Sequence, residues 1–330
     1  MKYKSIQVTR RGGPEALQVI ENELRAPAAG EARIKVEVTH VCQDDVAARV
    51  GNRPFLPKLP FTPGYAIIGR VDQIGEGVTQ VKVGERVAAL IQLGGYAEYV
   101  YWKADNLAPV PESLDAAEAS PLILNYLVAY QILNRVARVQ AGDKVLMVGA
   151  SGGCGTAFLQ LGKLAGLKMY GLASARKHAI LESYGAVPID YQRQDFVTEL
   201  HKAEPEGLDF VFNGMGEEYF ERGLAVLRKG GVLVHYGGPQ SMRGFFLLML
   251  KLIGYNLLPN GKTIKGYGTH REGVSGFKED WSHLFRLLEE RKIEPLIAGK
   301  FPLLEAARAN EMLESGQVSG SLVLLAGVDE

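Results

Sequence analysis

The sequence predicts an α/β protein with two domains, one rich in β-strands and one built as a doubly wound parallel sheet. The chain has 330 residues, more than the length at which one hydrophobic core stops growing. Short alternating stretches separated by turns fill residues 1 to about 110. From about residue 120, single strands alternate with single helices, a pattern that produces a parallel sheet with helices on both faces.

Strands of the first region are predicted from the alternation of apolar and polar residues. Clear examples are Ala32–Val38, Ala66–Ile74 and Glu85–Leu90. Glycine-rich turns such as Gly75-Glu76-Gly77 separate them. A further strand, Ser321–Leu325, is expected in the tail of the chain.

The doubly wound region begins with an apolar strand at 143–148 and a helical pattern that continues to Leu164. The further strands that we expect are Lys168–Ala173, Val187–Asp190, Asp209–Asn213, Gly231–Tyr236 and Thr263–Tyr267. The further helices that we expect are Ala175–Ser183, Asp195–Lys202, Glu218–Leu227, Gly244–Ile253, Phe277–Arg291 and Leu304–Ser315.

Composition excludes several classes of protein. Hydrophobic residues make up 47% of the chain and charged residues 22%, as in ordinary globular proteins. The formal net charge of zero argues against a general nucleic-acid binder and against a polybasic membrane anchor. Two cysteines suit a reducing compartment, and Met1–Ser5 lacks the apolar stretch of a signal peptide. The longest apolar run, Phe245–Leu258, is interrupted and too short to span a bilayer, so we expect a cytoplasmic protein.

A glycine-rich turn after the strand at 143–148 is the sharpest local motif. The strand runs into Gly149, Gly152 and Gly155, and an amphipathic helix follows. Glycine lets the backbone approach a pyrophosphate closely, and the N–H groups that begin the helix bind its negative charge. The alternative is a strand-to-helix corner that needs glycine for steric reasons alone. The βα units around the turn favour cofactor binding.

The end of the next strand distinguishes NAD from NADP. Binding of the ribose 2′-hydroxyl in NAD needs an acid there, about 20 residues after the turn. The strand instead ends Gly171-Leu172-Ala173, and Ser174-Ala175-Arg176-Lys177-His178 follows. Arg176 and Lys177 would pair with a 2′-phosphate, and Ser174 would add a hydrogen bond. The alternative, a solvated basic helix start, is disfavoured by the helix dipole, so we expect NADP(H).

Further motifs indicate a family. They include Gly12-Gly13-Pro14-Glu15, Thr62-Pro63-Gly64, Val83-Gly84-Glu85-Arg86-Val87, Leu124-Asn125-Tyr126, Pro188-Ile189-Asp190-Tyr191 and Val318-Ser319-Gly320-Ser321. With these, nearly the whole chain resembles the medium-chain dehydrogenase/reductases, and specifically the zinc-free quinone oxidoreductase group. Within that group it is most similar to the branch that contains a synaptic-vesicle membrane protein.

The resemblance implies a GroES-like catalytic domain formed by residues 1–121 and 271–330, with an NADP-binding Rossmann domain at 122–270. It also implies that Tyr236 to Pro239 lie near the nicotinamide. The full set of residues that we expect to bind the cofactor is Gly149, Gly152, Gly153, Cys154, Gly155, Ser174, Arg176, Lys177, Tyr191, Asn213, Tyr236, Gly237 and Gly238.

The resemblance also has departures, all near the expected reaction centre. Zinc-binding relatives have a Cys and a Gly-His-Glu segment, but this chain combines Cys42 with Gly64-Tyr65-Ala66. Too few ligands remain for zinc, which needs three protein groups even in a catalytic site, so we expect no metal. Cys42 is then interpreted as a small thiol lining a pocket. The quinone oxidoreductase group usually has Asn and Thr where Cys42 and Val128 stand here, which makes this pocket more apolar.

Without a metal, the chemistry implied is hydride delivery from NADPH to a quinone or to an activated alkene such as an enone. The protein would then stabilise the developing oxyanion with hydrogen-bond donors. Tyr65 replaces the metal-site His and is the first candidate, followed by Tyr126, Gln43 and Asp45. Structural roles are the alternative for each. A different class of function also stays open: a catalytically quiet NADPH-binding protein that acts through an apolar helix on a membrane or a protein partner.

The apolar segment 244–255 needs an explanation, because a helix that is apolar all round must be covered. We favour a pocket wall or lid together with a subunit contact over contact with a membrane. The strand Thr263–Tyr267 should be the exposed edge of the sheet, which relatives pair across a two-fold axis, so we expect a homodimer. Placing proline at Ile264 should weaken dimerisation if the N–H of Ile264 points to the partner subunit. Lys262 and Lys265 would instead protect the edge strand of a monomer.

Overall fold

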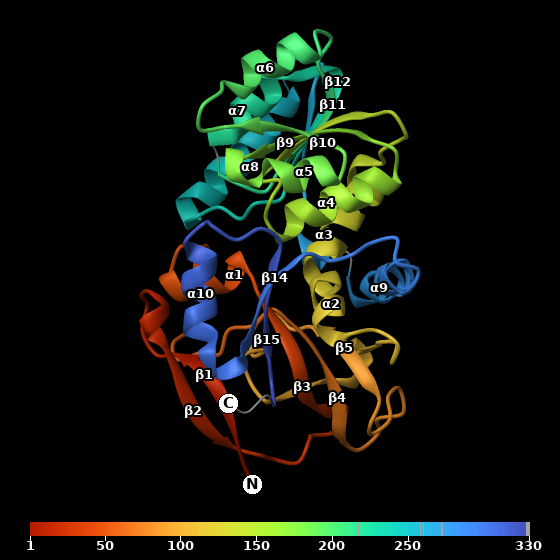
Figure 1. The fold of residues 1–330 in the computed structure, drawn as a ribbon. Coiled ribbons are helices and arrows are strands. Elements are labelled where there is room, and N and C mark those ends of the chain that lie inside the picture. The colour runs from red at the N-terminus through yellow and green to blue at the C-terminus, as the bar shows by residue number, and fades with distance from the viewer. Residues whose placement is uncertain (217, 258, 260, 272, 328–330) are drawn as a thin grey trace. The chain divides into compact units, whose positions relative to one another are not determined.

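The structure is a computed structural model that describes residues 1–216, 218–257, 259, 261–271 and 273–327. The chain divides into two compact units, one formed by Met1–Leu124 with Val274–Glu330 and one by Asn125–Gly273. The red N-terminal strands and the blue C-terminal strands of Figure 1 therefore belong to the same unit. The mixed α/β fold class predicted from the sequence is confirmed.

The first unit is built on antiparallel strands. A two-stranded ladder pairs β1 with β2, and a seven-stranded sheet has the order β14-β15-β3-β4-β5-β7, with β6 on β3. Only the β14–β15 pair of this sheet is parallel. The strands are β1 (Lys2–Val8), β2 (Leu17–Glu23), β3 (Glu31–Val41), β4 (Ala66–Ile74), β5 (Arg86–Leu90), β6 (Tyr99–Lys103), β7 (Ala108–Pro109), β14 (Ile297–Pro302) and β15 (Ser321–Leu325).

Helices of this unit pack beside the sheet, and Figure 1 shows α10 next to β14 and β15. Asp115 caps α2, because its side chain accepts the N–H of Glu118 at the start of the helix. The helices are α1 (Gln43–Val50), α2 (Ala116–Pro121), α9 (Gly273–Glu289) and α10 (Ala306–Glu314), with 3-10 turns η1 (Pro14–Ala16), η2 (Ala104–Asn106) and η7 (Leu303–Glu305). The 3-10 turn η6 (Thr269–Arg271) belongs to the second unit and precedes α9.

The second unit carries a six-stranded parallel sheet in the order β10-β9-β8-β11-β12-β13. In chain order this is 3-2-1-4-5-6, the Rossmann arrangement, in which the direction of winding reverses between β8 and β11. The strands are β8 (Lys144–Val148), β9 (Lys168–Ala173), β10 (Ala186–Asp190), β11 (Leu208–Asn213), β12 (Leu227–His235) and β13 (Thr263–Gly266).

The helices of the second unit follow the predicted order with shifted ends. The helix expected to reach Leu227 ends at Ala225, because Leu227 already pairs with Leu208 of β11 and is buried in the core. The helices are η3 (Leu122–Tyr126), which is a π-helical turn, α3 (Leu127–Gln131), the π-helical η4 (Ile132–Ala137), α4 (Gly153–Leu164), the 3-10 turn η5 (Ala175–Lys177), α5 (His178–Ser183), α6 (Phe196–Ala203), α7 (Glu218–Ala225) and α8 (Met242–Leu257).

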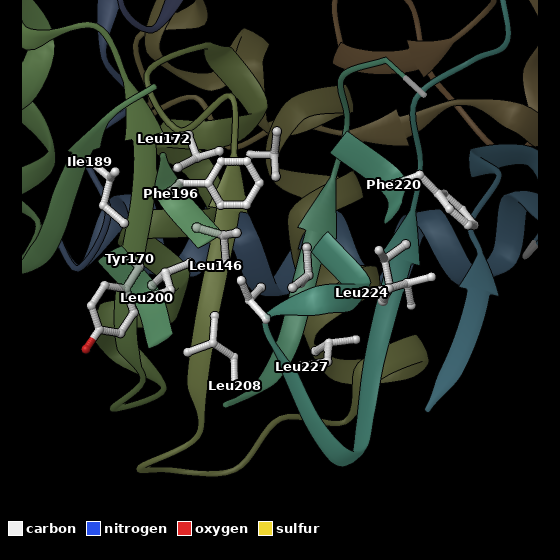
Figure 2. Close-up of a cluster of buried hydrophobic side chains, with 14 of the residues drawn as sticks. Leu146, Tyr170, Leu172, Ile189, Phe196, Leu200, Leu208, Phe220, Leu224 and Leu227 are labelled. Carbon is white, nitrogen blue, oxygen red and sulfur yellow. The ribbon is translucent and has the colours of Figure 1, made fainter. Parts of the chain in front are cut away.

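The core of the second unit lies between the parallel sheet and the helices that cover it. Figure 2 shows Leu146 and Leu172 from the strands beside Phe196 and Leu200 from α6, with Phe220 from α7 further along the sheet. Burial of such side chains is the main force that holds the unit together, at about 1.5 to 3 kcal/mol for each large residue. A rigid sheet then fixes the loops at its edges.

A buried acid joins β8 and β9 where these strands begin. Glu204 is buried and accepts hydrogen bonds from Lys144 (2.6 Å), from Lys168 and from the hydroxyl of Tyr170 (2.6 Å). Burial alone would raise the pKa of Glu204, but these hydrogen bonds outweigh it and hold the pKa at about 2. The carboxylate is therefore charged and ties the starting edge of the sheet together.

The outer edge of β13 is capped from within the chain. The side chain of Asn256, in the last turn of α8, accepts the N–H of Ile264 (2.8 Å) and donates to its carbonyl oxygen (2.9 Å). Within the chain, the N–H of Ile264, which the sequence analysis considered as a donor to a partner subunit, thus donates to Asn256. The ammonium group of Lys262 donates a hydrogen bond to the carbonyl oxygen of Leu224, and that of Lys265 donates to the carbonyl oxygen of Val136.

Candidate cofactor-binding site

The turn after β8 brings two stretches of backbone into close contact. Gly149 has φ +76°, a left-handed conformation that favours glycine. A Cβ on Gly155 would lie 2.4 Å from the carbonyl oxygen of Gly149, so only glycine fits there. Both glycines are thus required by the shape of the turn, and that shape brings glycine backbone to the start of α4.

The start of α4 is suited to binding an anion. Its N-cap residue is Gly152, which has no side chain that could cap the first N–H groups of the helix. Together with the helix dipole, they attract phosphate. Cys154 lies in this first turn, half-buried, with its Sγ 3.4 Å from Oδ1 of Asn125. Gly153 begins the helix.

Three loops converge where the parallel strands end, an edge that we call the carboxyl edge. The thioether sulfur of Met215 lies 3.0 Å from the place that a Cβ on Gly149 would take. The ring of Tyr236 lies over Gly214, and a Cβ on Gly237 would be 2.7 Å from the carbonyl oxygen of Met215. These contacts lie where the winding of the sheet reverses, which is where dinucleotides bind in such sheets. The sequence analysis missed Met215, since only the folded loops bring it to Gly149.

Asn213 shapes the loop after β11. Its side chain is fully buried, accepts the N–H of Met215 (3.0 Å) and donates to the carbonyl oxygen of Gly216 (3.3 Å). Its carbonyl oxygen also accepts the N–H of Tyr236 (3.0 Å), which links the loops after β11 and β12. Asn213 therefore positions the residues around it, while Gly238 in the neighbouring loop is exposed.

The basic pair predicted to select NADP lies on the 3-10 turn η5, directly after β9. The carbonyl oxygen of Ser174 accepts the N–H of Lys177 (2.9 Å) and closes the turn. Burial, and then the positive charge of Arg176, lowers the pKa of Lys177. Two cations are thus held close together at the carboxyl edge, and a phosphate group between them would relieve their repulsion. Tyr191, which follows β10 at the same edge, is 43% exposed.

In the first unit, Asp45 is enclosed by hydrogen-bond donors. It accepts the N–H groups of Gly64 (2.8 Å) and Cys42 (3.2 Å), the thiol of Cys42 (3.2 Å) and the hydroxyl of Tyr96 (3.3 Å). Burial raises the pKa of Asp45 to about 6 despite these bonds. Two residues before Cys42, the buried ring of His40 has no hydrogen-bond partner among the described residues, and burial lowers its pKa to about 4.

Gln43 lies between Cys42 and Asp45 in the sequence, and Tyr65 follows Gly64. The carbonyl oxygen of Tyr65 accepts the N–H groups of Ile91 (2.9 Å) and Gln92 (3.0 Å), which fixes the backbone before β4. Burial raises the pKa of the Tyr65 phenol, so it keeps its proton and can donate it in a hydrogen bond at neutral pH. Gln43, in the first turn of α1, is exposed.

Tyr126 ends the π-helical turn η3 in the second unit and is buried. Its hydroxyl finds no hydrogen-bond partner within the described part of the chain. Burial, and then the nearby Tyr184, raises the pKa of this phenol. Val128, two residues later, is also buried. Tyr126 is therefore a hydrogen-bond donor without an acceptor, enclosed by apolar surroundings.

A zinc ion does not fit the donor set around Cys42. Its thiol already donates to Asp45, and burial raises the pKa of the thiol, which opposes the thiolate that a metal needs. Over residues 1–216, 218–257, 259, 261–271 and 273–327, no group of three or more His, Cys, Asp or Glu side chains is placed to hold a metal. We therefore derive no chemistry through a metal ion.

Two family models match the chain. Residues 28–112 match the alcohol dehydrogenase GroES-like domain, and residues 184–324 match the zinc-binding dehydrogenase model. Both models fall on the elements described above: the first covers α1 and Asp45, and the second begins at Tyr184, two residues before β10.

Relatives and solved structures extend the match over the whole chain. The rat synaptic vesicle membrane protein VAT-1 homolog is 30% identical over 92% of this chain and 79% of its own length. Pig quinone oxidoreductase is 29% identical over 97% of both chains. The Escherichia coli quinone oxidoreductase, solved in complex with NADPH, superposes with a TM-score of 0.88 at 27% identity over 98% of this chain and 99% of that one.

The chain therefore belongs to the medium-chain dehydrogenase/reductases, a family of oxidoreductases, and within it to the group that contains quinone oxidoreductases and VAT-1 homologs. This confirms the family predicted from the sequence motifs.

Proposed function

We propose that this oxidoreductase transfers hydride from NADPH to a quinone or to an α,β-unsaturated carbonyl compound. The observation that carries the proposal is the carboxyl edge of the parallel sheet, where a glycine-rich turn and a basic pair follow adjacent strands. The cofactor is NADP(H), in line with the NADPH complex of the similar Escherichia coli enzyme. The small-molecule substrate is one that can accept hydride without help from a metal.

Each part of the carboxyl edge has its own task in this proposal. The N–H groups that begin α4 bind the pyrophosphate, and the turn with Ser174, Arg176 and Lys177 binds the 2′-phosphate. Tyr191 and Tyr236 pack against the rest of the cofactor, and Asn213 keeps the Met215 loop in place. Bound NADPH supplies a hydride, which is the chemistry that the protein itself lacks.

Tyr65 is the proposed donor to the oxygen that gains negative charge in the substrate. Its raised pKa keeps the phenol protonated, and its backbone is fixed by two hydrogen bonds, so the donor is positioned before the reaction. Asp45 holds the neighbouring Gly64 and thereby positions Tyr65. Gln43 and Tyr126 are further candidates; the exposed amide of Gln43 is free to adapt, whereas the Tyr126 hydroxyl must first be uncovered.

The test is NADPH oxidation by the purified chain with a panel of quinones and enones, comparing Tyr65→Phe, Tyr126→Phe and the wild type. Loss of one oxyanion donor lowers kcat about a hundredfold, so Tyr65→Phe should show that loss with KM little changed. Tyr99→Phe, in β6, serves as the matched control. Turnover of a quinone with full kcat in Tyr65→Phe would remove Tyr65 from the mechanism.

A catalytically quiet NADPH-binding protein is the second candidate function. Two observations favour it: the thiol of Cys42 is committed to Asp45, and Val128 offers no polar group. The same assay separates the two functions, because a quiet protein binds NADPH in titration but oxidises it with no member of the panel.

A homodimer joined along the edge strand β13 also stays a proposal. Sedimentation of the wild type at micromolar concentration is expected to show a dimer. A monomer that binds NADPH fully would contradict this. Asn256→Ala frees the Ile264 N–H and carbonyl, so it should strengthen association if the β13 edge takes part.

A further inference from the structure

Met215 is a half-exposed methionine at the carboxyl edge. The chain has seven methionines, and Met147 and Met169, which lie in strands of the parallel sheet, are buried. Met215 follows the end of β11 by two residues and is 50% exposed. A dissolved oxidant therefore reaches the sulfur of Met215, whereas the sheet encloses the sulfurs of Met147 and Met169.

The side chain of Met215 lies against the glycine-rich turn. Its Sδ and Cγ atoms lie 3.0 and 3.1 Å from the place that a Cβ on Gly149 would take. Gly149 has φ +76° and follows Val148, which pairs with Asn213 at the ends of β8 and β11. The thioether thus occupies the space that glycine leaves at this turn, and a group added to the sulfur changes that contact.

The backbone of Met215 is fixed on both sides. Its N–H donates to the side chain of Asn213 (3.0 Å), which is fully buried. Its carbonyl oxygen lies 2.7 Å from the place of a Cβ on Gly237, in the loop after β12. The N–H of Tyr236 donates to the carbonyl oxygen of Asn213 (3.0 Å) and ties the two loops together. A change at the sulfur therefore acts on the turn at Gly149, because the loop that carries Met215 is held in place.

The two cysteines are different targets for an oxidant. Cys42 is buried, its thiol donates to Asp45 (3.2 Å), and burial raises the pKa of this thiol, so little of the reactive thiolate forms. A thioether reacts without losing a proton, so exposure is what Met215 needs. Cys154, half-buried in the first turn of α4, is the competing sulfur at this edge, but thiol reductants reverse the first products of thiol oxidation.

We propose that Met215 is an oxidation site through which hydrogen peroxide weakens the binding of NADPH. The peroxide transfers one oxygen atom to the sulfur of Met215: its O–O bond breaks, an S=O bond forms and water leaves. The sulfur loses two electrons and the peroxide gains them. The apolar thioether becomes a polar sulfoxide, which methionine sulfoxide reductases convert back.

The sulfoxide oxygen is a hydrogen-bond acceptor held beside Gly149. The inference rests on the proposed function, in which the N–H groups after this turn bind the pyrophosphate, itself a set of acceptor oxygens. Two acceptors at one place repel each other, so oxidation of Met215 weakens cofactor binding. Bound NADPH in turn covers the sulfur and protects it.

Treatment of the full chain with hydrogen peroxide, with and without saturating NADPH, tests this proposal. Peptide mass spectrometry locates the added oxygen, and calorimetric titration measures NADPH affinity once oxidant and cofactor are removed. Met215 should be oxidised, and NADPH affinity should fall about tenfold, as for one lost hydrogen bond to a charged group. NADPH should protect Met215 but not Met312, which is 36% exposed on α10 of the first unit.

Repair distinguishes Met215 from Cys154. A methionine sulfoxide reductase should restore the NADPH affinity of the oxidised chain, whereas dithiothreitol alone should leave it low. Restoration by dithiothreitol alone would place the effect on Cys154 and would overturn the proposal.

Two substitutions of Met215 separate the sulfur from the shape of the side chain. Met215→Leu removes the sulfur and keeps an apolar side chain of similar volume, so its NADPH affinity should be the same before and after peroxide. Met215→Gln carries a polar oxygen near the place of the sulfoxide and should bind NADPH about tenfold more weakly than Met215→Leu without any oxidant. Met312→Leu is the matched control and should stay as sensitive to peroxide as the wild type.

The outcomes separate this inference from the proposed function. A wild type that binds NADPH equally well before and after oxygen is added at Met215 would overturn the inference alone. So would a wild type that gains no oxygen there, or a Met215→Leu variant that loses as much affinity on treatment as the wild type does. An untreated wild type that binds no NADPH would overturn the proposed function, and this inference with it.

Discussion

The carboxyl edge of the parallel sheet and the first turn of α1 both gather polar groups, but they use them in opposite ways. At the start of α4 no side chain of the described residues caps the helix, and Arg176 and Lys177 are held near each other after β9. At the start of α1, Asp45 accepts four hydrogen bonds from the protein itself. The first region gathers groups that attract an anion, whereas the carboxylate of the second is bonded within the protein.

This difference explains why cofactor residues are easier to infer than catalytic ones. An anion site requires N–H groups and cations with no competing acid, and that pattern is visible in the backbone turn and its neighbours. A buried carboxylate that is fully bonded, such as Asp45, fits a structural role and a positioning role equally well. Only experiments that substitute residues in each region separately can show which groups act on the substrate.

The largest effect is expected from Gly155→Val. The new side chain would begin 2.4 Å from the carbonyl oxygen of Gly149 and would push the turn away from α4. Losing two or more hydrogen bonds to a charged phosphate, at about 1.5 to 3 kcal/mol each, should weaken NADPH binding about a thousandfold. Calorimetric titration measures the loss. Gly254→Ala, where a Cβ meets nothing within 4 Å, should bind NADPH as the wild type does.

A smaller and more selective effect is expected from the double variant Arg176→Ala, Lys177→Ala. Two charge-assisted hydrogen bonds to the 2′-phosphate are lost, so NADPH should bind more weakly by about 2 to 4 kcal/mol. NADH, which lacks this phosphate, should bind as before. Lys202→Ala, an exposed lysine of α6, is the control. Equal losses for both cofactors would show that the pair does not read the phosphate.

In the first unit, His40 and Asp45 should make opposite contributions to stability as pH falls. The folded pKa of His40, about 4, is below its usual value, so its contribution is present above about pH 6.5 and is lost toward pH 4. The folded pKa of Asp45, about 6, is raised, so its contribution is present below about pH 4 and is lost as pH rises through 6. Each amounts to at most about 3 kcal/mol, and in the wild type they offset.

Urea unfolding of two variants near pH 7 and near pH 4.5 measures these contributions separately. Relative to the wild type, His40→Leu should gain stability as pH falls, because the protonation of histidine in the unfolded chain is removed. Asp45→Asn should lose stability relative to the wild type over the same range. Parallel pH profiles for all three proteins would mean that neither group is enclosed as the structure has it.

The smallest effect is expected from removing metal. Cys42 is committed to Asp45, and Tyr65-Ala66 supplies neither imidazole nor carboxylate, so the purified chain should contain far less than one zinc. Treatment with a chelator should leave NADPH oxidation unchanged. Elemental analysis that finds about one zinc per chain, lost together with activity, would reverse our interpretation of the α1 cluster.

Sequence reasoning succeeded where the structure depends on near neighbours in the chain. The turn at Gly149 and Gly155, the basic pair and the six parallel strands follow from spacing along the chain, and strand pairing reproduces the Rossmann order. The end of α7 was misplaced because Leu227 pairs with Leu208, and pairing between distant segments overrides a local helical pattern.

Contacts between distant loops were outside the reach of such reasoning. Met215 reaches Gly149 only because β8 and β11 are neighbours in the sheet, although the two residues are far apart in sequence. Asn256 caps Ile264 because α8 packs back on β13, and no motif marks an asparagine for that task. The site roles assigned to Tyr65 and Tyr126 stay predictions that the kinetic variants must decide.

The ion cluster around Glu204 affects which parts of this protein can change in sequence during evolution. It joins β8 and β9 at the ends opposite the glycine-rich turn, so these strands are held together away from the loops of the carboxyl edge. Loops that a scaffold does not need are free to vary. Substitutions in the loops of the carboxyl edge can therefore change what those loops bind, while the anchored end preserves folding. The same fold can in this way serve successive chemistries over evolutionary time.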